Sequence, residues 1–426
     1  MIASWARAGL GPTPVRTAMG IRVPRWVLVP VALGVAALPL LKPSGPGNSS
    51  PVDIYFAISI GVAILWAGLA AQDLRLPYAL ATGIFMVGGA IGALAGPYPR
   101  EGLLALVQDL VLLLWCGVLV NTARSPTAFK WIVRAWAWSS VAWALLLFAG
   151  VATGNAAIAG VSDRTGVRAS LTFGDPNYAA NYFFLSFMVV MATRTPRNRL
   201  LRLACCGALL GALALTGSNG GLLSCAVGVS VVVLFYVARR WGTLPLVATA
   251  SFALVAALIV LAMAQALPIE AIAKDSGIPL LRDSIGRSSQ SAQERQWLIT
   301  ETIDLYKQGV PWGLGPGSTK PLLQTQLAPY AFQTHDDYIE SIVERGLIGA
   351  FGLLVLIGSV GWRTWSVAAK PLSAEFAAIF PRTSPLAGAV AGLAVSASYY
   401  QILHFRHVWT LLAIIAALFV WGRRRP

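Results

Sequence analysis

The sequence predicts an all-α polytopic membrane protein with about 12 transmembrane helices. Its 426 residues are 57% hydrophobic and only 12% charged, which is far from the composition of a soluble globular domain. Apolar runs of about 20 residues, the length of one helical crossing, recur along the whole chain. The ten-residue alternation typical of a membrane barrel does not occur in the sequence, and a helix satisfies its own backbone groups within lipid.

The apolar runs divide the chain into three parts. Transmembrane helices 1–9 are expected within residues 1–266, with a short external loop at 153–176. A long external segment follows at 267–337, and transmembrane helices 10–12 are expected within residues 338–426. The individual spans are predicted at 23–41, 52–71, 77–95, 102–122, 129–152, 177–193, 199–216, 220–238, 243–266, 338–362, 385–403 and 407–422. The first run lacks a signal-peptidase-like cleavage site, which favours an uncleaved first span.

The basic residues predict the orientation. The chain carries 32 Lys and Arg residues and a formal net charge of +15. With the N-terminus in the cytoplasm, these residues gather at the inside connections, as the positive-inside rule requires. Both termini are then cytoplasmic, and because the basic excess is an orientation signal, nucleic-acid binding is not expected. The four cysteines fall inside apolar segments and are interpreted as packing residues.

Function is expected in the two long external segments, because most other external links have ten residues or fewer. Within the longer one, residues 291–309 predict an amphipathic helix that ends before a run containing Pro311 and three glycines. We expect this helix to lie against the bilayer and to cap a lipid-facing groove. The apolar residues expected on one side of it are Leu298, Ile299, Ile303, Leu305 and Tyr306.

The strongest candidate for catalysis is His335, at the mouth of the tenth span. Histidine titrates near pH 7 and suits removal of a proton from an attacking hydroxyl. Asp336 or Asp337 could orient its ring or cap the following helix, and Tyr338 and Arg345 follow in the same polar cluster. The alternative is a histidine that only marks the helix boundary. His404, in the last external turn, could likewise line the groove or mark the interface.

Arginines supply the candidate phosphate-binding groups, since guanidinium forks suit phosphate oxygens. Arg168 is the strongest candidate, and a solvated basic face is an equally good interpretation of the arginines in the long segment. The full set, with one supporting amide, is Arg164, Arg168, Arg282, Arg287, Arg295 and Asn177. The histidines are not spaced with carboxylates as a metal set, and nucleotide-binding motifs do not occur in the sequence, so neither a metal nor another cofactor is expected.

Acting together, these groups suit glycosyl transfer. The arginines would hold the diphosphate of an activated donor, while His335 removes the proton of an acceptor hydroxyl as that hydroxyl attacks the anomeric carbon. A diphosphate is a good leaving group, and fixed cations can stabilise its charge electrostatically.

The chain resembles the O-antigen ligase and polymerase superfamily of bacterial envelope glycosyltransferases over roughly residues 160–362. The resemblance rests on three groups of motifs: Arg168 with Phe173-Gly-Asp-Pro-Asn177, Glu294-Arg295 with Pro311-Trp-Gly-Leu-Gly-Pro-Gly317, and His335-Asp-Asp-Tyr338 with Glu344-Arg-Gly346. One departure is Ser218-Asn219-Gly220, where the family often has Ser-Arg-Gly, and it removes one expected cation.

The resemblance implies a metal-independent, inverting transfer at the periplasmic face of the bacterial inner membrane. The donor would be a glycan linked to undecaprenyl diphosphate, and for ligases the acceptor is lipid A–core. It also implies that the segment 267–337 is a periplasmic catalytic loop in contact with membrane lipids.

Several functions stay open at this point. The ligase is favoured because the chain has little beyond the membrane core, but a repeat-unit polymerase or a protein O-oligosaccharyltransferase shares the same motif. A secondary transporter would normally place ionisable groups and broken helices near the bilayer midplane, and the sequence offers little of either. Asp109, the deepest carboxylate, is expected to pair with an arginine on the external side.

Overall fold

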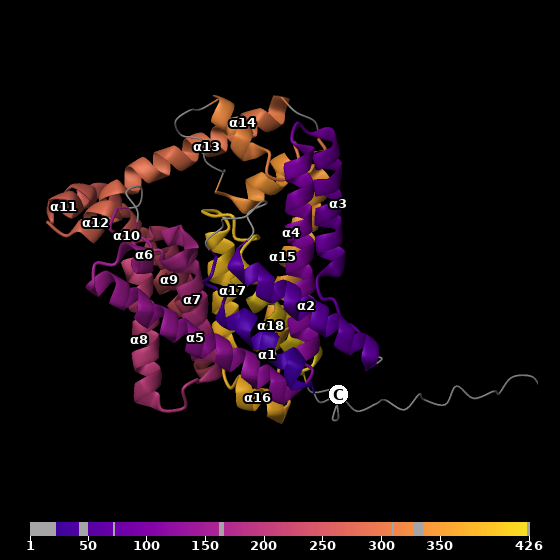
Figure 1. Cartoon of the computed structure of the whole chain (residues 1–426). Helices are drawn as coiled ribbons and strands as arrows, with labels where there is room; N and C mark the ends of the chain where they lie inside the picture. The colour runs from indigo at the N-terminus through magenta and orange to yellow at the C-terminus, as the bar shows by residue number, and fades with distance from the viewer. Residues whose placement is uncertain are drawn as a thin grey trace, which may run out of the picture.

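The computed structural model describes residues 23–41, 50–70, 73–161, 166–308, 311–326 and 335–423. Within these ranges the chain forms helices and no strand, with an isolated β-bridge between Leu372 and Arg423 (Figure 1). The predicted all-α fold is therefore confirmed.

Twelve of the helices in the described residues coincide with the predicted spans. They are α1 (Arg25–Ala36), α2 (Pro51–Leu69), α3 (Ala79–Ala95), α4 (Pro99–Thr122), α5 (Pro126–Ala152), α7 (Pro176–Thr193), α8 (Arg199–Leu215), α9 (Asn219–Trp241), α10 (Thr243–Ala266), α15 (Asp337–Ala369), α17 (Ser384–Ser396) and α18 (Arg406–Val420). By length and composition, six of them could cross a membrane, namely α2, α4, α5, α9, α10 and α15, and four others are shorter apolar helices. The multi-pass character is confirmed, and the count of twelve crossings stays a prediction.

Among the described residues, seven short helices and the 21-residue α13 occupy the connections. They are α6 (Ala156–Ala159), η2 (Leu171–Phe173), α11 (Ile269–Asp275), α12 (Pro279–Asp283), η3 (Ile285–Arg287), α13 (Ser288–Gln308), α14 (Thr319–Gln326) and α16 (Ala374–Ile379). In Figure 1, α13 and α14 lie across one end of the bundle, above α15 and α17, and α11 and α12 lie to one side.

The helix predicted at 291–309 is α13. Three of its side chains form a buried face. Leu298, Thr302 and Leu305 are buried at a spacing of four and three residues, which is one face of an α-helix. Leu298 and Leu305 form a small core with Leu323 of α14. Ile303 is 37% exposed, and its place on an apolar side that faces the bilayer stays a prediction.

Two further differences concern the last third of the chain. The span predicted at 385–403 was wrong at its C-terminal end, because α17 stops at Ser396 and residues 397–405 form an irregular connection to α18. In addition, α15 is broken at Gly346, whose backbone lies in the left-handed region with φ 63°.

Helices α3 and α15 pack closely against each other, and glycines make this possible. A Cβ atom added to Gly88 of α3 would lie 2.3 Å from the Gly349 nitrogen, and one added to Gly352 would lie 2.4 Å from the Phe85 nitrogen. Helices in membranes approach most closely where small residues face each other. Gly88 and Gly349 therefore allow α3 and α15 to pack closely.

Replacing Gly88 with alanine should destabilise the detergent-solubilised protein by about 1–3 kcal/mol, because the new methyl group would overlap backbone atoms of α15. The measurement is the apparent Tm. The matched control is Gly83→Ala in the same helix, where a Cβ atom meets nothing within 4 Å. Equal Tm values for the two variants would contradict the close packing of α3 on α15.

Candidate functional site

The irregular connection between α17 and α18, residues 397–405, is where the candidate residues meet. It is bound to the first turn of α15 by two backbone contacts. The Asp337 carboxylate accepts a hydrogen bond from the Ile402 N–H at 2.8 Å, and the Ala397 carbonyl accepts one from the Asp337 N–H at 2.9 Å. The Gln401 side chain also donates to the buried Glu340 carboxylate. These contacts satisfy backbone groups that the end of α17 leaves open.

His335 lies directly before this anchored turn. Its φ is 55°, in the left-handed region that residues with a side chain adopt in only a few per cent of cases, His more often than most, and that costs about 1–2 kcal/mol. Asp336 caps α15, since its carboxylate accepts from the Ile339 N–H at 2.9 Å, and burial raises the pKa of Asp336. A residue held in a costly backbone conformation beside a polar surface is a candidate for function.

Arg168 is joined to the same connection through a chain of hydrogen bonds. Its guanidinium donates to the Thr216 carbonyl and to the Asn177 amide oxygen, each at 3.0 Å. The Asn177 oxygen also accepts from the Ser218 hydroxyl at 2.9 Å, and that hydroxyl lies 3.1 Å from the Tyr400 hydroxyl. The predicted pair of Arg168 and Asn177 is therefore brought into direct contact.

Two arginines of the long segment extend this group. The Arg295 guanidinium lies over the rings of Tyr399 and Tyr400, at 5.7 and 5.6 Å from their centroids, within the range of a cation–π contact. Burial lowers the pKa of Arg168, and the positive charges of Arg287 and Arg295 lower it further. Arg168, Arg287 and Arg295, all predicted to bind phosphate, therefore lie close enough for their charges to interact.

The other two predicted arginines are placed differently. Arg282 is 59% exposed at its side chain and is paired with Asp283 at 2.9 Å. Asp283 also accepts from the Val167 N–H at 3.1 Å, which ties η3 and α12 to the segment before α7. Arg164 lies outside the described residues. Arg282 is thus the least suited of the described arginines to bind an anion, because its charge is already neutralised.

Arg345 is buried inside the bundle. It pairs with Asp109 of α4 at 2.8 Å, with both side chains almost fully buried, and its guanidinium lies 3.9 Å from the centroid of the Phe85 ring. The expected pairing of Asp109 with an arginine is confirmed. Because a buried ion pair strongly disfavours loss of either partner, Arg345 anchors α15 to α4.

Glu344 binds the glycine-rich turn that follows α13. Its carboxylate accepts from the Gly317 N–H at 2.8 Å, from the Thr319 N–H at 3.1 Å and from the Thr319 hydroxyl at 2.5 Å. Its carbonyl accepts from the Gly315 N–H at 2.9 Å. The break at Gly346 makes room for the turn, since a Cβ atom there would lie 2.3 Å from the Pro311 carbonyl oxygen. The sequence predicted this turn as the end of a helix and as a motif of the family resemblance, but not its contact with Glu344.

A polar cavity of about 680 Å³ opens beside these elements. Its wall is formed by the start of α4, the turn before α7, α14, the first turn of α15 and the connection 397–405. His404 is part of this wall, and burial lowers the pKa of its imidazole. Sequence reasoning missed three charged residues of the wall, Arg100, Glu101 and Lys320, because they look like ordinary charges at helix ends.

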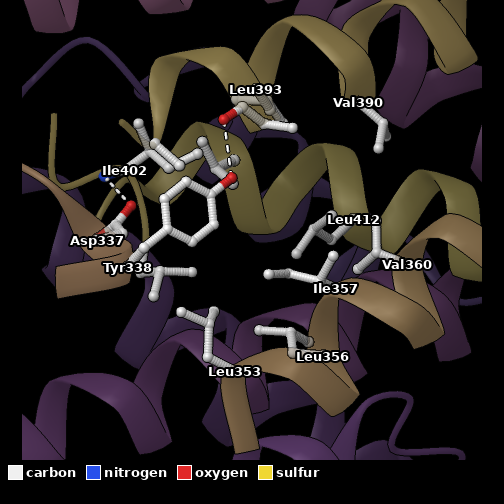
Figure 2. A pocket seen from close by; sticks show the side chains of 14 residues that line it. Asp337, Tyr338, Leu353, Leu356, Ile357, Val360, Val390, Leu393, Ile402 and Leu412 are labelled. Atoms are coloured by element: carbon white, nitrogen blue, oxygen red, sulfur yellow. Dashed lines mark hydrogen bonds between the residues drawn. The ribbon is translucent and has the colours of Figure 1, made fainter. Parts of the chain in front are cut away.

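A smaller apolar pocket, of about 100 Å³, is lined by residues of α15, α17 and α18. Figure 2 shows the Tyr338 ring at one end of it, with Leu353, Ile357 and Leu412 among the aliphatic side chains around the rest. The Tyr338 hydroxyl donates to the Ala394 carbonyl at 2.8 Å. The first turn of α15 therefore contributes Tyr338 to an apolar pocket and Glu340 to the polar cavity.

Metal-binding groups are not found in the described ranges: His, Cys, Asp and Glu side chains do not gather there in sets of three or more that could hold an ion.

Comparison with known families gives one match, in which residues 203–354 fit the family model described as O-antigen ligase. The matched region includes α13, the glycine-rich turn and the start of α15 with His335 and Glu344. Comparison with curated proteins gives no match.

The Glu344 contacts predict a stability effect. Glu344→Ala should lower the free energy of unfolding by several kcal/mol, because each buried donor left without an acceptor costs about 1–3 kcal/mol. The apparent Tm in detergent and the rate of proteolysis within 311–326 measure the effect. The control is Asp304→Ala, which removes an exposed carboxylate from α13. If the two variants have the same Tm, Glu344 does not hold the turn.

Proposed function

We propose that this chain, whose residues 203–354 match the family model described as O-antigen ligase, is a ligase. In this proposal it transfers a glycan from undecaprenyl diphosphate to lipid A–core at the periplasmic face of the bacterial inner membrane. The observation that carries the proposal is the meeting of the Arg168 network, Arg295 and the His335 end of α15 at the connection 397–405.

The arginines would hold the donor diphosphate. The bonds from Arg168 to Thr216 and Asn177 fix the plane of its guanidinium, so that its remaining nitrogen can meet a phosphate oxygen without an ordering cost. Arg287 and Arg295 add positive charge to the same neighbourhood. Asn219 stands where the family often has an arginine, and Arg295 supplies a cation to the same group through its contact with Tyr400.

The transfer proceeds in one displacement. The acceptor hydroxyl oxygen attacks the anomeric carbon of the donor, His335 takes the hydroxyl proton, and undecaprenyl diphosphate leaves with the bonding electrons. The configuration at the anomeric carbon is inverted. Fixed guanidinium groups stabilise the charge that develops on the leaving diphosphate. The apolar pocket that Asp337 and Tyr338 line offers a hydrocarbon surface for a lipid chain, two residues along the chain from His335 (Figure 2).

The alternatives are less well supported. A repeat-unit polymerase or a protein O-oligosaccharyltransferase would use the same groups with another acceptor. A transporter would need an open site at the break in α15, but the glycine-rich turn fills that break, with the Gly313 and Gly346 backbones in close contact.

His335→Asn should abolish glycan transfer, with a loss of about 10²–10⁴-fold, since a general base contributes a factor of that size. Asparagine tolerates the left-handed backbone of this position, so the variant should insert and fold normally. The measurement is a lipopolysaccharide gel of a deletion strain complemented with each form, with membrane insertion of the variant as the control. Normal transfer by the variant removes His335 from the mechanism.

The same gel separates a ligase from a polymerase. Loss of a ligase leaves core without any O-unit, whereas loss of a polymerase leaves core with a single unit.

Arg168→Ala should reduce transfer far more than Arg282→Ala. Loss of a hydrogen bond to a charged group costs about 1.5–3 kcal/mol, whereas Arg282 is exposed and already paired with Asp283. Initial rates of transfer in proteoliposomes, with donor titrated, measure the difference. Equal rates for the two variants would mean that the Arg168 network does not hold the donor.

A further inference from the structure

The wall of the polar cavity includes charged side chains that make no hydrogen bond or ion pair with the other described residues. Arg406 is bound to Asp53 by two hydrogen bonds, at 3.0 and 2.7 Å, and Glu340 is bound by Gln401. Arg406 and Glu340 of the wall are therefore already bound to other side chains of the protein. By contrast, Arg100 and Lys320 form no hydrogen bond or ion pair with any described residue.

The charged side chains of the wall that bind no other described residue are Arg100, Glu101 and Lys320. They come from two separate elements. Arg100 and Glu101 are in the first turn of α4, and Lys320 is in α14. The glycine-rich turn brings the two elements together, since a Cβ atom added to Gly317 would lie 4.0 Å from the Glu101 Cβ. Glu344 holds that turn in place through the Gly317 N–H. Gly317, which Glu344 holds in place, therefore lies in the cavity wall together with Lys320.

Aromatic rings form another part of the wall. Phe173, Tyr178 and Phe405 all line it, and the Tyr178 and Phe405 rings lie 4.3 Å apart between centroids. An apolar wall with a few placed polar groups is typical of a small-molecule site, as is a volume between about 300 and 1,000 Å³. A carboxylate beside two cations suits a ligand that both donates and accepts hydrogen bonds, because a carboxylate only accepts and Lys and Arg only donate.

Sugar rings have this chemistry: their hydroxyls donate and accept, and their C–H faces pack on aromatic rings. We propose that the cavity binds the acceptor glycan, with Glu101, Lys320 and Arg100 as the residues that select it. This inference rests on the transfer reaction proposed above.

The position of the cavity supports acceptor binding over donor binding. The three arginines assigned to the diphosphate are not part of the cavity wall, whereas Glu340 and His404 are. Glu340 lies in the first turn of α15, which begins shortly after His335. Gln401 binds Glu340 and belongs to the connection that also binds Asp337. A sugar in the cavity would therefore present its hydroxyl near His335 while the donor diphosphate lies at Arg168.

The test uses the full chain in proteoliposomes with lipid-linked glycan donor and purified lipid A–core acceptor. The variants are Glu101→Gln, Lys320→Gln and both together. We expect the double variant to raise the KM for lipid A–core about tenfold or more, as loss of charged hydrogen bonds implies, with kcat and the donor KM unchanged. Lys307→Gln removes the same charge as the single variant Lys320→Gln, but from the exposed face of α13; it is the control and should leave all three constants unchanged.

Two results separate the two proposals. If the wild-type protein transfers no glycan to lipid A–core, the proposed function fails, and this inference fails with it. If the wild-type protein transfers glycan but the double variant raises the donor KM instead, or changes the acceptor KM less than about twofold, the assignment of the cavity to the acceptor is overturned while the ligase function stands.

Discussion

The contact on which the candidate site depends is the one between the first turn of α15 and the connection 397–405. The Asp337 carboxylate and N–H both bind that connection, through Ile402 and Ala397. The connection also carries Tyr400, which reaches the Arg168 network, and His404, which lines the cavity. Without this attachment, the proposed base and the proposed phosphate-binding arginines would belong to unconnected parts of the fold.

The next turn of α15 provides a second attachment. Three consecutive residues bind three different partners: Glu344 holds the glycine-rich turn, Arg345 pairs with Asp109 of α4, and Gly346 leaves room for the Pro311 carbonyl. Burying charged groups is costly unless they are paired and hydrogen-bonded, and the Glu344 and Arg345 side chains both have such partners. These three residues therefore fix α15 to α4 and to the glycine-rich turn, whose Gly317 lines the cavity.

Hydropathy was sufficient to predict most of the fold, but it failed where backbone contacts decide the structure. The end of α17 at Ser396 was missed because Ile402 and Leu403 continue the apolar pattern. Hydropathy measures composition, and the irregular backbone there is stabilised by Asp337 from another helix. The break at Gly346 was missed for a similar reason, since its cause is a turn some thirty residues earlier in the chain.

The candidate site was predictable where the residue type itself points to the chemistry. His335, Arg168 and Asn177 were identified from their types and surroundings, and the structure brings Arg168 and Asn177 into contact. Arg345 was grouped with them, but it is buried in an ion pair. Glu101 and Lys320 could not be found in this way, because the chemistry of the cavity depends on which elements meet there.

The central claim is that His335 faces the side of the membrane away from the cytoplasm, and labelling of single cysteines tests it most directly. In a chain whose native cysteines are replaced, cysteines at positions 320, 335 and 382 would be exposed to a membrane-impermeant maleimide before and after permeabilisation of spheroplasts. We expect positions 320 and 335 to react in intact spheroplasts and position 382 only after permeabilisation. Reaction of position 382 in intact spheroplasts, with positions 320 and 335 protected until permeabilisation, would contradict the account.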